Sequence, residues 1–475
     1  MSREPTIARP IAPTGDLLTV RVTSLDGEGA SLAHVEGESA KGQNVRVYGG
    51  VPGDLAVVEV LSRGRNATWT KLLRVVEQGP DRTPAPCVHA RACGGCPWQA
   101  VSRPAQRGAK AERLRRLMDS SHNLRSLPSR PLRWSSRDFG FRTKVQMPVG
   151  GRPGALITGL YGPHSKTLVP IGECIVQHPL AESVRRAVLE RLNEHRVAPW
   201  YVNDASEGDA SGELRTLLLR VSEHEAQVAL ILIVGDPTKR DWRALSQQLM
   251  GEIPHLASIG LNVNSAQQNV VLGPNTTHLA GRALLNESIL GMDVDVDAAS
   301  FFQTSAVGAT LLAEAVLDAS PMAFPHLLEV YSGTGLFTRA LRGRYRHATL
   351  IERSDGSART AAARFPDARV IHGDAESALR SLARERLLPG EGAAEGSPDL
   401  ILLDPPRGGL GSAVDAVAAL GPPLVVLVSC SPDAFVKDVD RLATHGYEAV
   451  RVEGVDLFPH TPHFEVVTLL QKAHL

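Results

Sequence analysis

The chain has 475 residues, which is enough for about three domains that each bury a core of their own. Its 51 Lys and Arg residues balance 51 Asp and Glu residues. The net charge is therefore zero, and the chain is not basic throughout. The longest apolar runs, residues 228–234 and 424–428, are too short to cross a bilayer, and we recognise no basic-then-apolar leader. We therefore expect a cytoplasmic protein with no membrane partner.

The N-terminal region is predicted to form a small β-barrel. Residues 1–13, rich in Pro and Arg, are expected to be a disordered tail. Strand-like runs follow at residues 17–22, 44–48, 55–61 and 69–76, separated by Gly-rich turns. Four or five strands in about sixty residues are typical of a small barrel. Residues 14–78 resemble a TRAM domain, an OB-like module found on RNA-modifying enzymes.

Residues 79–298 are predicted to form a central α+β domain that begins with a basic segment. Residues 81–147 hold 14 Lys and Arg against 4 Asp and Glu, and a helix is expected at residues 104–118. Aromatic residues are interleaved with these cations, which suits a polyanion whose bases can stack. The alternative is a cationic helix face in contact with solvent. Arg142 is our candidate in this segment for contact with RNA. Further strands are expected at residues 227–234 and 259–264.

Four of the five cysteines are grouped by spacing. Three lie in CVHARACGGC with the spacing C-x5-C-x2-C, and the fourth follows 78 residues later; they are Cys87, Cys93, Cys96 and Cys174. Gly94 and Gly95 let the backbone bend around the sulfurs, so that amide N–H groups can stabilise their charge. Zinc and a [4Fe–4S] cluster both accept four thiolates, so the spacing leaves both open. Unrelated buried thiols are the third possibility.

From about residue 299, predicted strands alternate with predicted helices. The strands are expected at residues 327–331, 349–352, 369–372, 400–404, 424–430 and 466–471. Parallel strands that alternate with helices indicate a doubly wound sheet over residues 299–475. Residues 391–398 read as a surface loop ahead of a strand.

Candidate cofactor residues follow the first three of these strands. In LLEVYSGTGLFT, Gly333 and Gly335 precede a helix, while Thr338 occupies the third glycine position of the dinucleotide fingerprint. Glu352 ends the second strand, where an acid can bind both ribose hydroxyls of a nucleoside. Asp374 follows the third strand at an equivalent position. The pattern favours S-adenosylmethionine over NAD, and tight strand-to-helix turns are the alternative.

Asp404 and Cys430 end the fourth and fifth strands, at the same expected edge of the sheet. Carbon 5 of uracil is a poor nucleophile, but a thiolate that adds to carbon 6 makes an enolate that can attack a sulfonium methyl group. A base must then remove the carbon 5 proton. His460, His463 and Glu465 are the candidates. We favour Glu465, because a carboxylate at the start of an apolar strand is expected to have a raised pKa.

Five motifs occur in order: SFFQTS, YSGTGLFT, DPPRGG, VSCSP and FPHTPHFE. With the barrel and the cysteine group upstream, the chain resembles the RNA 5-methyluridine (uracil-C5) methyltransferase family, specifically members with a TRAM domain and a [4Fe–4S] cluster. The resemblance implies a multi-domain α/β fold with a C-terminal Rossmann-like, class I S-adenosylmethionine-dependent domain. It also implies a structured RNA as partner, 23S rRNA ahead of tRNA, and no obligate protein partner.

The resemblance assigns roles to particular residues. Cys430 would be the nucleophile, Glu465 the general base, and Phe301 would stack near the target nucleotides. The cofactor positions would be Gln303, Tyr331, Gly333, Glu352 and Asp404. The four grouped cysteines would hold the cluster, with zinc the less expected occupant.

Three positions depart from the usual family pattern, because Thr143, Ser305 and Ser431 stand where Asn is common. Two other functions stay open. A cytosine-5 RNA methyltransferase usually has two cysteines in its site, whereas here Cys430 alone is outside the group. A non-catalytic RNA-binding or chaperone protein can also be built on the same scaffold.

Overall fold

The computed structural model describes residues 15–37, 44–128, 130–163, 165–202, 210–266, 270–300, 302–387 and 397–473. The predicted tail at residues 1–13, residues 391–396 of the predicted loop, and Phe301 lie outside these ranges. The chain divides into two compact units, which are described one at a time. The first comprises residues 1–113, 160–169 and 458–462, and the second comprises residues 114–159, 170–457 and 463–475.

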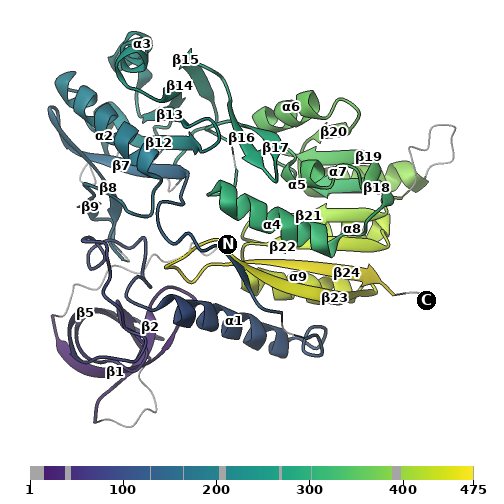
Figure 1. The fold of residues 1–475 in the computed structure, drawn as a ribbon, viewed down its shortest axis with the longest axis horizontal. Coiled ribbons are helices and arrows are strands. Elements are labelled where there is room, and N and C mark those ends of the chain that lie inside the picture. The colour runs from purple at the N-terminus through teal and green to yellow at the C-terminus, as the bar shows by residue number, and fades with distance from the viewer. Residues whose placement is uncertain are drawn as a thin grey trace, which may run out of the picture. The chain divides into compact units, whose positions relative to one another are not determined.

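A closed five-stranded barrel forms the base of the first unit, as the sequence predicted (Figure 1). Its strands occur in the order β1-β2-β3-β5-β4. Alternating apolar residues such as Val20, Val22, Val45 and Val47 point inward, because successive side chains of a strand face opposite sides. The bounds are β1 Leu17–Leu25, β2 Ser31–Val35, β3 Val45–Tyr48, β4 Leu55–Arg63 and β5 Thr68–Glu77.

Helix α1 (Arg103–Ser120) follows the cysteine-rich segment and contains the helix predicted at residues 104–118. Within the first unit, its buried Gln106 side chain donates to the carbonyls of Trp98 and Val101 and accepts the N–H of His460 at 2.8 Å. Lys110 donates from Nζ to the Phe458 carbonyl at 2.9 Å. The helix therefore anchors the segment that immediately precedes the predicted base.

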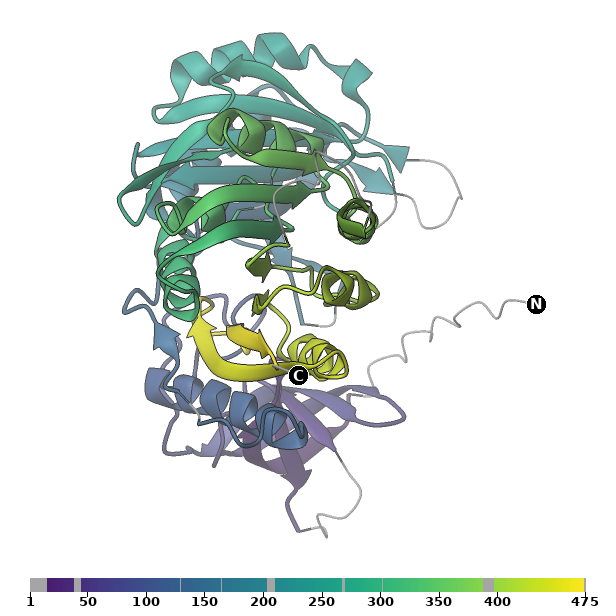
Figure 2. The same cartoon turned by 90° about the vertical axis from the view of Figure 1, so that its right-hand side faces the viewer.

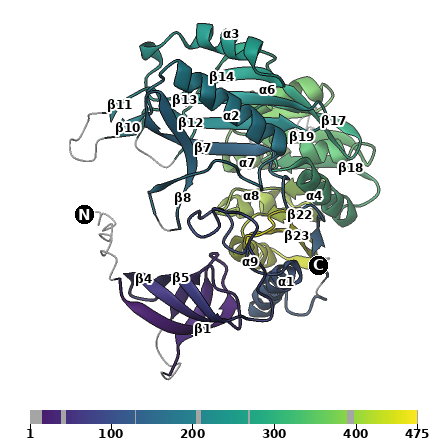
Figure 3. The same ribbon diagram turned by 60° about the vertical axis from the view of Figure 1, so that its left-hand side comes forward.

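A seven-stranded sheet in the order β15-β14-β13-β12-β7-β8-β9 contains the two strands predicted for the central region. Helix α2 packs on β12 and β13, and α3 packs on β14 and β15 (Figure 3). The hairpin β16–β17 contacts β12 and β13. The bounds are β7 Lys144–Arg152, β8 Ala155–Tyr161, β9 Leu168–Pro170, α2 Pro179–Glu194, β10 Tyr201–Val202, β11 Ala210–Ser211, β12 Leu214–Ser222, β13 Gln227–Val234, η1 Pro237–Lys239, α3 Trp242–Glu252, β14 Leu256–Val263, β15 Thr276–Gly281, β16 Leu285–Ile289 and β17 Met292–Val296.

The C-terminal part of the second unit contains an eight-stranded sheet in the order β20-β19-β18-β21-β22-β24-β23-β6. The strands from β20 to β22 are parallel, as predicted. The predicted strand at residues 466–471 is β24, and it differs from the expectation because it runs antiparallel to β22 and β23. A hairpin-like return from β23, a strand that the sequence analysis missed, reverses the chain direction.

Helices cover both faces of this sheet (Figure 2). Helices α7, α8 and α9 adjoin one another and share a large apolar core with the central strands, while α4 packs on β22, β23 and β24. None of the helices in the described ranges is long and apolar enough to cross a membrane. The bounds are β6 Arg133–Trp134, α4 Ala306–Ala319, β18 Phe324–Val330, α5 Leu336–Ala340, β19 Tyr345–Glu352, α6 Asp355–Arg364, β20 Arg369–His372, α7 Ala375–Leu387, β21 Leu400–Leu403, α8 Ala413–Leu420, β22 Leu424–Ser429, α9 Pro432–Ala443, β23 Tyr447–Asp456 and β24 Glu465–Lys472.

The boundary predicted between residues 298 and 299 stays a prediction, because the residues on both sides belong to the second unit.

Candidate active site

The turn after β18 has the geometry of a ligand-binding loop. Tyr331 and Gly333 have positive φ angles of 63° and 56°, a region that favours glycine. A Cβ atom on Gly335 would lie 2.4 Å from the ring of Phe365, so this position requires glycine. A Cβ atom on Gly333 would meet no atom within 4 Å, so the turn borders open space.

Glu352 is the last residue of β19 and is fixed against this turn. Its carboxylate accepts the N–H of Gly333 at 2.8 Å and the N–H of Ser354 at 2.6 Å. Each carboxylate oxygen has a second lone pair, so two ribose hydroxyls can still bind there. The residues at this turn therefore fit the nucleoside part of S-adenosylmethionine.

Asp374, which follows β20, makes hydrogen bonds to the first turn of the next helix. It accepts hydrogen bonds from the N–H and hydroxyl of Ser377 at 3.1 Å and 3.2 Å. The backbone hydrogen bond from Ser377 is the largest cause of a lowered Asp374 pKa. This carboxylate therefore binds the first turn of α7 in addition to lying at the predicted edge.

Antiparallel pairing of β22 with β24 brings the predicted nucleophile and base together. Ser429 lies opposite Val466 in the register, and the next residues outward are Cys430 and Glu465. Asp404 follows β21, which pairs with β22 on its other side. The second unit thus assembles three of the predicted catalytic and cofactor residues at the ends of three adjacent strands.

Mutual electrostatic effects follow from this arrangement. Burial, followed by the charges of Glu465 and Asp404, raises the pKa of the half-buried Cys430 thiol to about 11. Burial raises the pKa of Glu465 to about 8, as the sequence predicted, and that of Asp404 to about 7. The charge of Arg407 opposes these shifts at Cys430 and Glu465. Positive charge near this edge favours the ionised forms that the chemistry needs.

The two histidines that precede Glu465 in the sequence differ from it, one in the unit to which it belongs and the other in burial. His460 belongs to the first unit, is buried, and is held by Gln106. His463 is exposed at the surface of the protein. Glu465 is 4% exposed and is the next residue beyond the Ser429–Val466 pair. The position of Glu465 is the one that suits a base next to Cys430.

Buried carboxyl groups near this edge predict a pH dependence of stability. Burial also raises the pKa of Glu329 to about 8, although its carboxylate accepts the N–H of Thr338 at 2.7 Å. When a carboxyl pKa is raised on folding, the folded state keeps a proton that the unfolded chain has already released. Stability is then lost as the pH rises from the unfolded pKa to the folded pKa.

We expect the free energy of unfolding to fall between about pH 5 and pH 8. Glu329→Gln mimics the neutral acid and is expected to be more stable than the wild type at the upper pH and to show a smaller fall. Urea denaturation at both pH values measures this, with Glu448→Gln as the exposed control. An unchanged fall in Glu329→Gln would contradict the prediction.

The departures from the family pattern have local explanations in the second unit. The Ser305 hydroxyl accepts the Gly308 N–H at 2.9 Å and caps α4, and the Ser431 hydroxyl accepts the Ala434 N–H at 3.4 Å and caps α9. Ser and Asn are both favourable N-cap residues. Thr143 donates its N–H and its hydroxyl to the Thr304 carbonyl at 2.8 Å and 3.1 Å. Each of these three side chains therefore makes a hydrogen bond to the local backbone.

Gln303 and Arg142 are the sequence neighbours of Thr304 and Thr143, which the hydrogen bonds above join. Gln303 is 6% exposed and precedes α4. Arg142 makes backbone hydrogen bonds to Val176 and His178, and its predicted contact with RNA stays a prediction. Phe301 lies outside the described residues, so its stacking role also stays a prediction.

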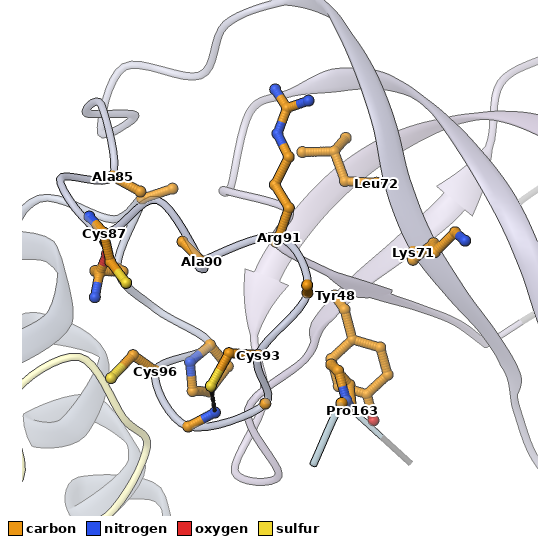
Figure 4. A pocket seen from close by; sticks show the side chains of 18 of the residues that line it. Tyr48, Lys71, Leu72, Ala85, Cys87, Ala90, Arg91, Cys93, Cys96 and Pro163 are labelled. Atoms are coloured by element: carbon orange, nitrogen blue, oxygen red, sulfur yellow. Dashed lines mark hydrogen bonds between the residues drawn. The ribbon is translucent and has the colours of Figure 1, made fainter. Parts of the chain in front are cut away.

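Cys87, Cys93 and Cys96 line one cavity of about 1370 Å³ in the first unit (Figure 4). Burial raises the pKa of Cys93, and the Gly95 N–H donates to its sulfur at 3.3 Å, as predicted. The Gly94 N–H instead donates to the Tyr161 carbonyl at 3.1 Å. Among the residues that the structure describes, no three Cys, His, Asp or Glu side chains are grouped to hold a metal ion. The predicted cluster therefore stays a prediction, although thiols with amide donors suit it chemically.

Cys174 lies in the second unit beside a buried ion pair that the sequence analysis missed. Its N–H donates to Glu182 at 3.1 Å, and Glu182 pairs with Arg185 at 2.8 Å. Arg185 also donates to the Gly172 carbonyl at 2.7 Å. This pair fixes the backbone on which the Cys174 thiol is carried. The spacing of Glu182 and Arg185, three residues apart on a helix, was the sequence signal that could have predicted this pair.

The basic segment is less available to a polyanion than its composition suggested. Several of its arginines form ion pairs inside their own unit: Arg82 with Asp54, Arg115 with Asp119, Arg133 with Glu453 and Arg137 with Glu223. On the barrel, the Tyr48 and Trp69 rings stack at 5.6 Å and Arg46 lies 4.8 Å from the Trp69 ring, although Arg46 also forms ion pairs with Asp26 and Glu28. Stacked aromatic and cationic groups suit bases and phosphates.

The family model described as tRNA (uracil-5-)-methyltransferase matches residues 238–473. An uncharacterised RNA methyltransferase of Gloeobacter violaceus is 30% identical, over 98% of this chain and all of the relative. One from Geobacter sulfurreducens is 29% identical over 98% of this chain and 92% of the relative.

Among solved structures, the Pyrococcus abyssi tRNA (uracil-54, C5)-methyltransferase in complex with S-adenosyl-L-homocysteine has a TM-score of 0.72. It is 22% identical, and the alignment covers 95% of this chain and 99% of that one. This likeness confirms the predicted fold class.

Proposed function

The chain belongs to the RNA (uracil-5-)-methyltransferase family, and we propose that it methylates carbon 5 of a specific uridine in structured RNA through a covalent bond from Cys430. The observation that carries the proposal is the position of Cys430 and Glu465 directly beyond the Ser429–Val466 pair. The Gly333 turn and Glu352, at the same end of the parallel strands, support a methyl-donor site beside them.

In this mechanism, Cys430 acts first. Its thiol loses a proton, and the thiolate forms a bond to carbon 6 of the uracil, which opens the carbon 5–carbon 6 double bond to an enolate. S-adenosylmethionine would supply the electrophilic methyl group that carbon 5 takes up, while the sulfur keeps the electron pair of the broken S–CH3 bond and S-adenosylhomocysteine leaves. Because the Cys430 pKa is about 11, the nearby charge of Arg407 helps the thiolate to form.

Glu465 completes the reaction. Its ionised carboxylate removes the carbon 5 proton, the double bond re-forms, and the Cys430 thiolate leaves carbon 6. Glu465 has a pKa of about 8, close enough to neutrality for it both to accept and to release a proton. The uridine must leave its stack to reach the thiol, which costs less in a loop than in a helix.

For the RNA, we propose 23S rRNA first and tRNA second, as the family resemblance predicts. Purified protein and labelled S-adenosylmethionine are incubated with transcripts of each, and 5-methyluridine is identified in the digested RNA. Mapping this nucleoside in RNA from a deletion strain gives the position. If the wild-type protein transfers no methyl group to any cellular RNA, the proposed function is wrong.

We also propose a [4Fe–4S] cluster held by Cys87, Cys93, Cys96 and Cys174. The thiols of the first three along one cavity, and the N–H of Gly95 on a sulfur, support this proposal. Such a cluster with four protein ligands would organise the surrounding loops and take no part in methyl transfer.

Protein purified without oxygen is expected to contain about four iron and four sulfide per chain. Cys93→Ala is expected to lose most of this iron, whereas Cys430→Ala is expected to keep it. Elemental analysis and the visible absorption of the cluster measure the outcome. One zinc ion per chain without sulfide would contradict the cluster.

A further inference from the structure

Two cationic side chains lie directly opposite each other inside the central sheet. Arg220 on β12 pairs with Lys144 on β7 in the antiparallel register. Arg220 is 1% exposed, and Lys144 is partly buried. Like charges at directly opposite positions destabilise a sheet, and burial adds the loss of hydration. The arrangement is therefore unfavourable for folding taken alone.

The carboxylate of Asp297 acts on both cations through its charge. Within the described ranges, the polar contacts of Lys144 and Arg220 are hydrogen bonds to backbone carbonyls rather than ion pairs with Asp or Glu. The Asp297 carboxylate itself accepts the N–H of Ala299 and the hydroxyl of Ser300. Burial and the charge of Arg220 lower the pKa of Lys144 to about 7.

Their hydrogen bonds go instead to backbone carbonyls within the SFFQT motif. Arg220 donates to the Gln303 carbonyl at 3.3 Å and to the Ser300 carbonyl at 3.2 Å. Lys144 donates to the same Ser300 carbonyl at 3.3 Å. The Arg220 guanidinium also lies 5.7 Å from the centre of the Phe302 ring.

Thr143, the neighbour of Lys144, donates twice to the Thr304 carbonyl. Donors from β12, from β7 and from the residue before β7 thus orient the carbonyls of Ser300, Gln303 and Thr304. We propose that Arg220 and Lys144 are positioning residues, which hold the backbone of Gln303 in the conformation that binds the methyl donor. The inference rests on the proposed function for the role of Gln303, and it adds two residues that act through it.

A purely structural role and a positioning role predict different results. Replacing one of two opposed like charges by an apolar side chain of similar length relieves their repulsion, which offsets the hydrogen bond lost to the backbone carbonyl, so the fold is expected to keep its stability. If the pair is kept to position Gln303, the same replacement weakens ligand binding. In that case the variant loses affinity for the ligand while its thermal stability stays the same or rises.

The experiment compares Lys144→Met and Arg220→Met with Arg215→Met in the full-length protein. Arg215 is a matched control, because it lies on the same strand and donates to two carbonyls, those of Asn264 and Ala266, away from Gln303. The probe is S-adenosyl-L-homocysteine, titrated by calorimetry, and thermal unfolding is measured on the same samples.

We expect Lys144→Met and Arg220→Met to bind the probe about tenfold more weakly, as when a charged hydrogen bond that fixes a binding loop is lost. The Tm of Lys144→Met should be unchanged or higher, and Arg215→Met should keep wild-type affinity. If Arg220→Met fails to fold, Lys144→Met and Thr143→Val decide the question, since Thr143→Val removes one donor and keeps the shape.

Wild-type affinity in Lys144→Met, a loss of affinity that parallels a loss of Tm, or an equal loss in Arg215→Met would overturn the inference. The proposed function fails in a different way, when wild-type protein methylates no RNA. Because the probe measurement needs no RNA and no turnover, the two failures are distinguishable.

Discussion

Cys430→Ala is expected to form no 5-methyluridine, with kcat reduced by roughly 10⁴-fold or more because the covalent step has no substitute nucleophile. The variant should fold, since the side chain is small, half-buried and outside β22. Methyl transfer to RNA and unfolding temperature are measured side by side. The wild type should form a covalent complex with 5-fluorouridine RNA, and the variant should form none.

This variant also separates the enzyme from a non-catalytic RNA-binding or chaperone protein. If the biological effect of the protein depends only on RNA binding, a strain that carries Cys430→Ala should behave as the wild type does. Retained 5-methyluridine in that strain would show that another group is the nucleophile. Binding of the RNA itself should be nearly unchanged, because the thiol contributes little contact area.

Glu465→Gln is expected to stop the reaction after methyl transfer, with turnover about 10²- to 10⁴-fold slower than in the wild type. The amide cannot take the carbon 5 proton, so the thiolate cannot leave carbon 6. Ordinary uridine RNA should then remain bound covalently to the protein through Cys430. A gel under denaturing conditions detects this complex, and mass spectrometry of the attached nucleotide tests for the added methyl group.

Two controls make this result specific. Glu465→Gln combined with Cys430→Ala should give no complex, and His463→Gln, at an exposed position, should turn over normally. Wild-type activity should rise with pH through about 8 as Glu465 ionises, and should rise further toward the Cys430 pKa of about 11 as the thiolate forms. Full turnover by Glu465→Gln, or release of methylated RNA at the wild-type rate, would exclude Glu465 as the base.

The reactive residues of the site were predictable because each one lies at the end of a strand, and a short stretch of sequence indicates where a strand ends. Apolar runs that end at Glu352, Asp404 and Cys430 predict strands, and parallel strands that alternate with helices carry their terminal residues to one edge. The barrel was predictable for a similar reason, because short alternating runs and Gly-rich turns are local signals. The structure confirms both the barrel and the parallel strands from β20 to β22.

The sequence by itself therefore determined which residues are reactive and at the end of which strand each one lies. Only the tertiary structure decided that β24 runs antiparallel and thereby places Glu465 beside Cys430, and that Arg220 and Lys144 meet at the Ser300 carbonyl. Such partners are distant along the chain. Their pairing depends on strand order and register, which long-range packing fixes and which no local pattern of residues specifies.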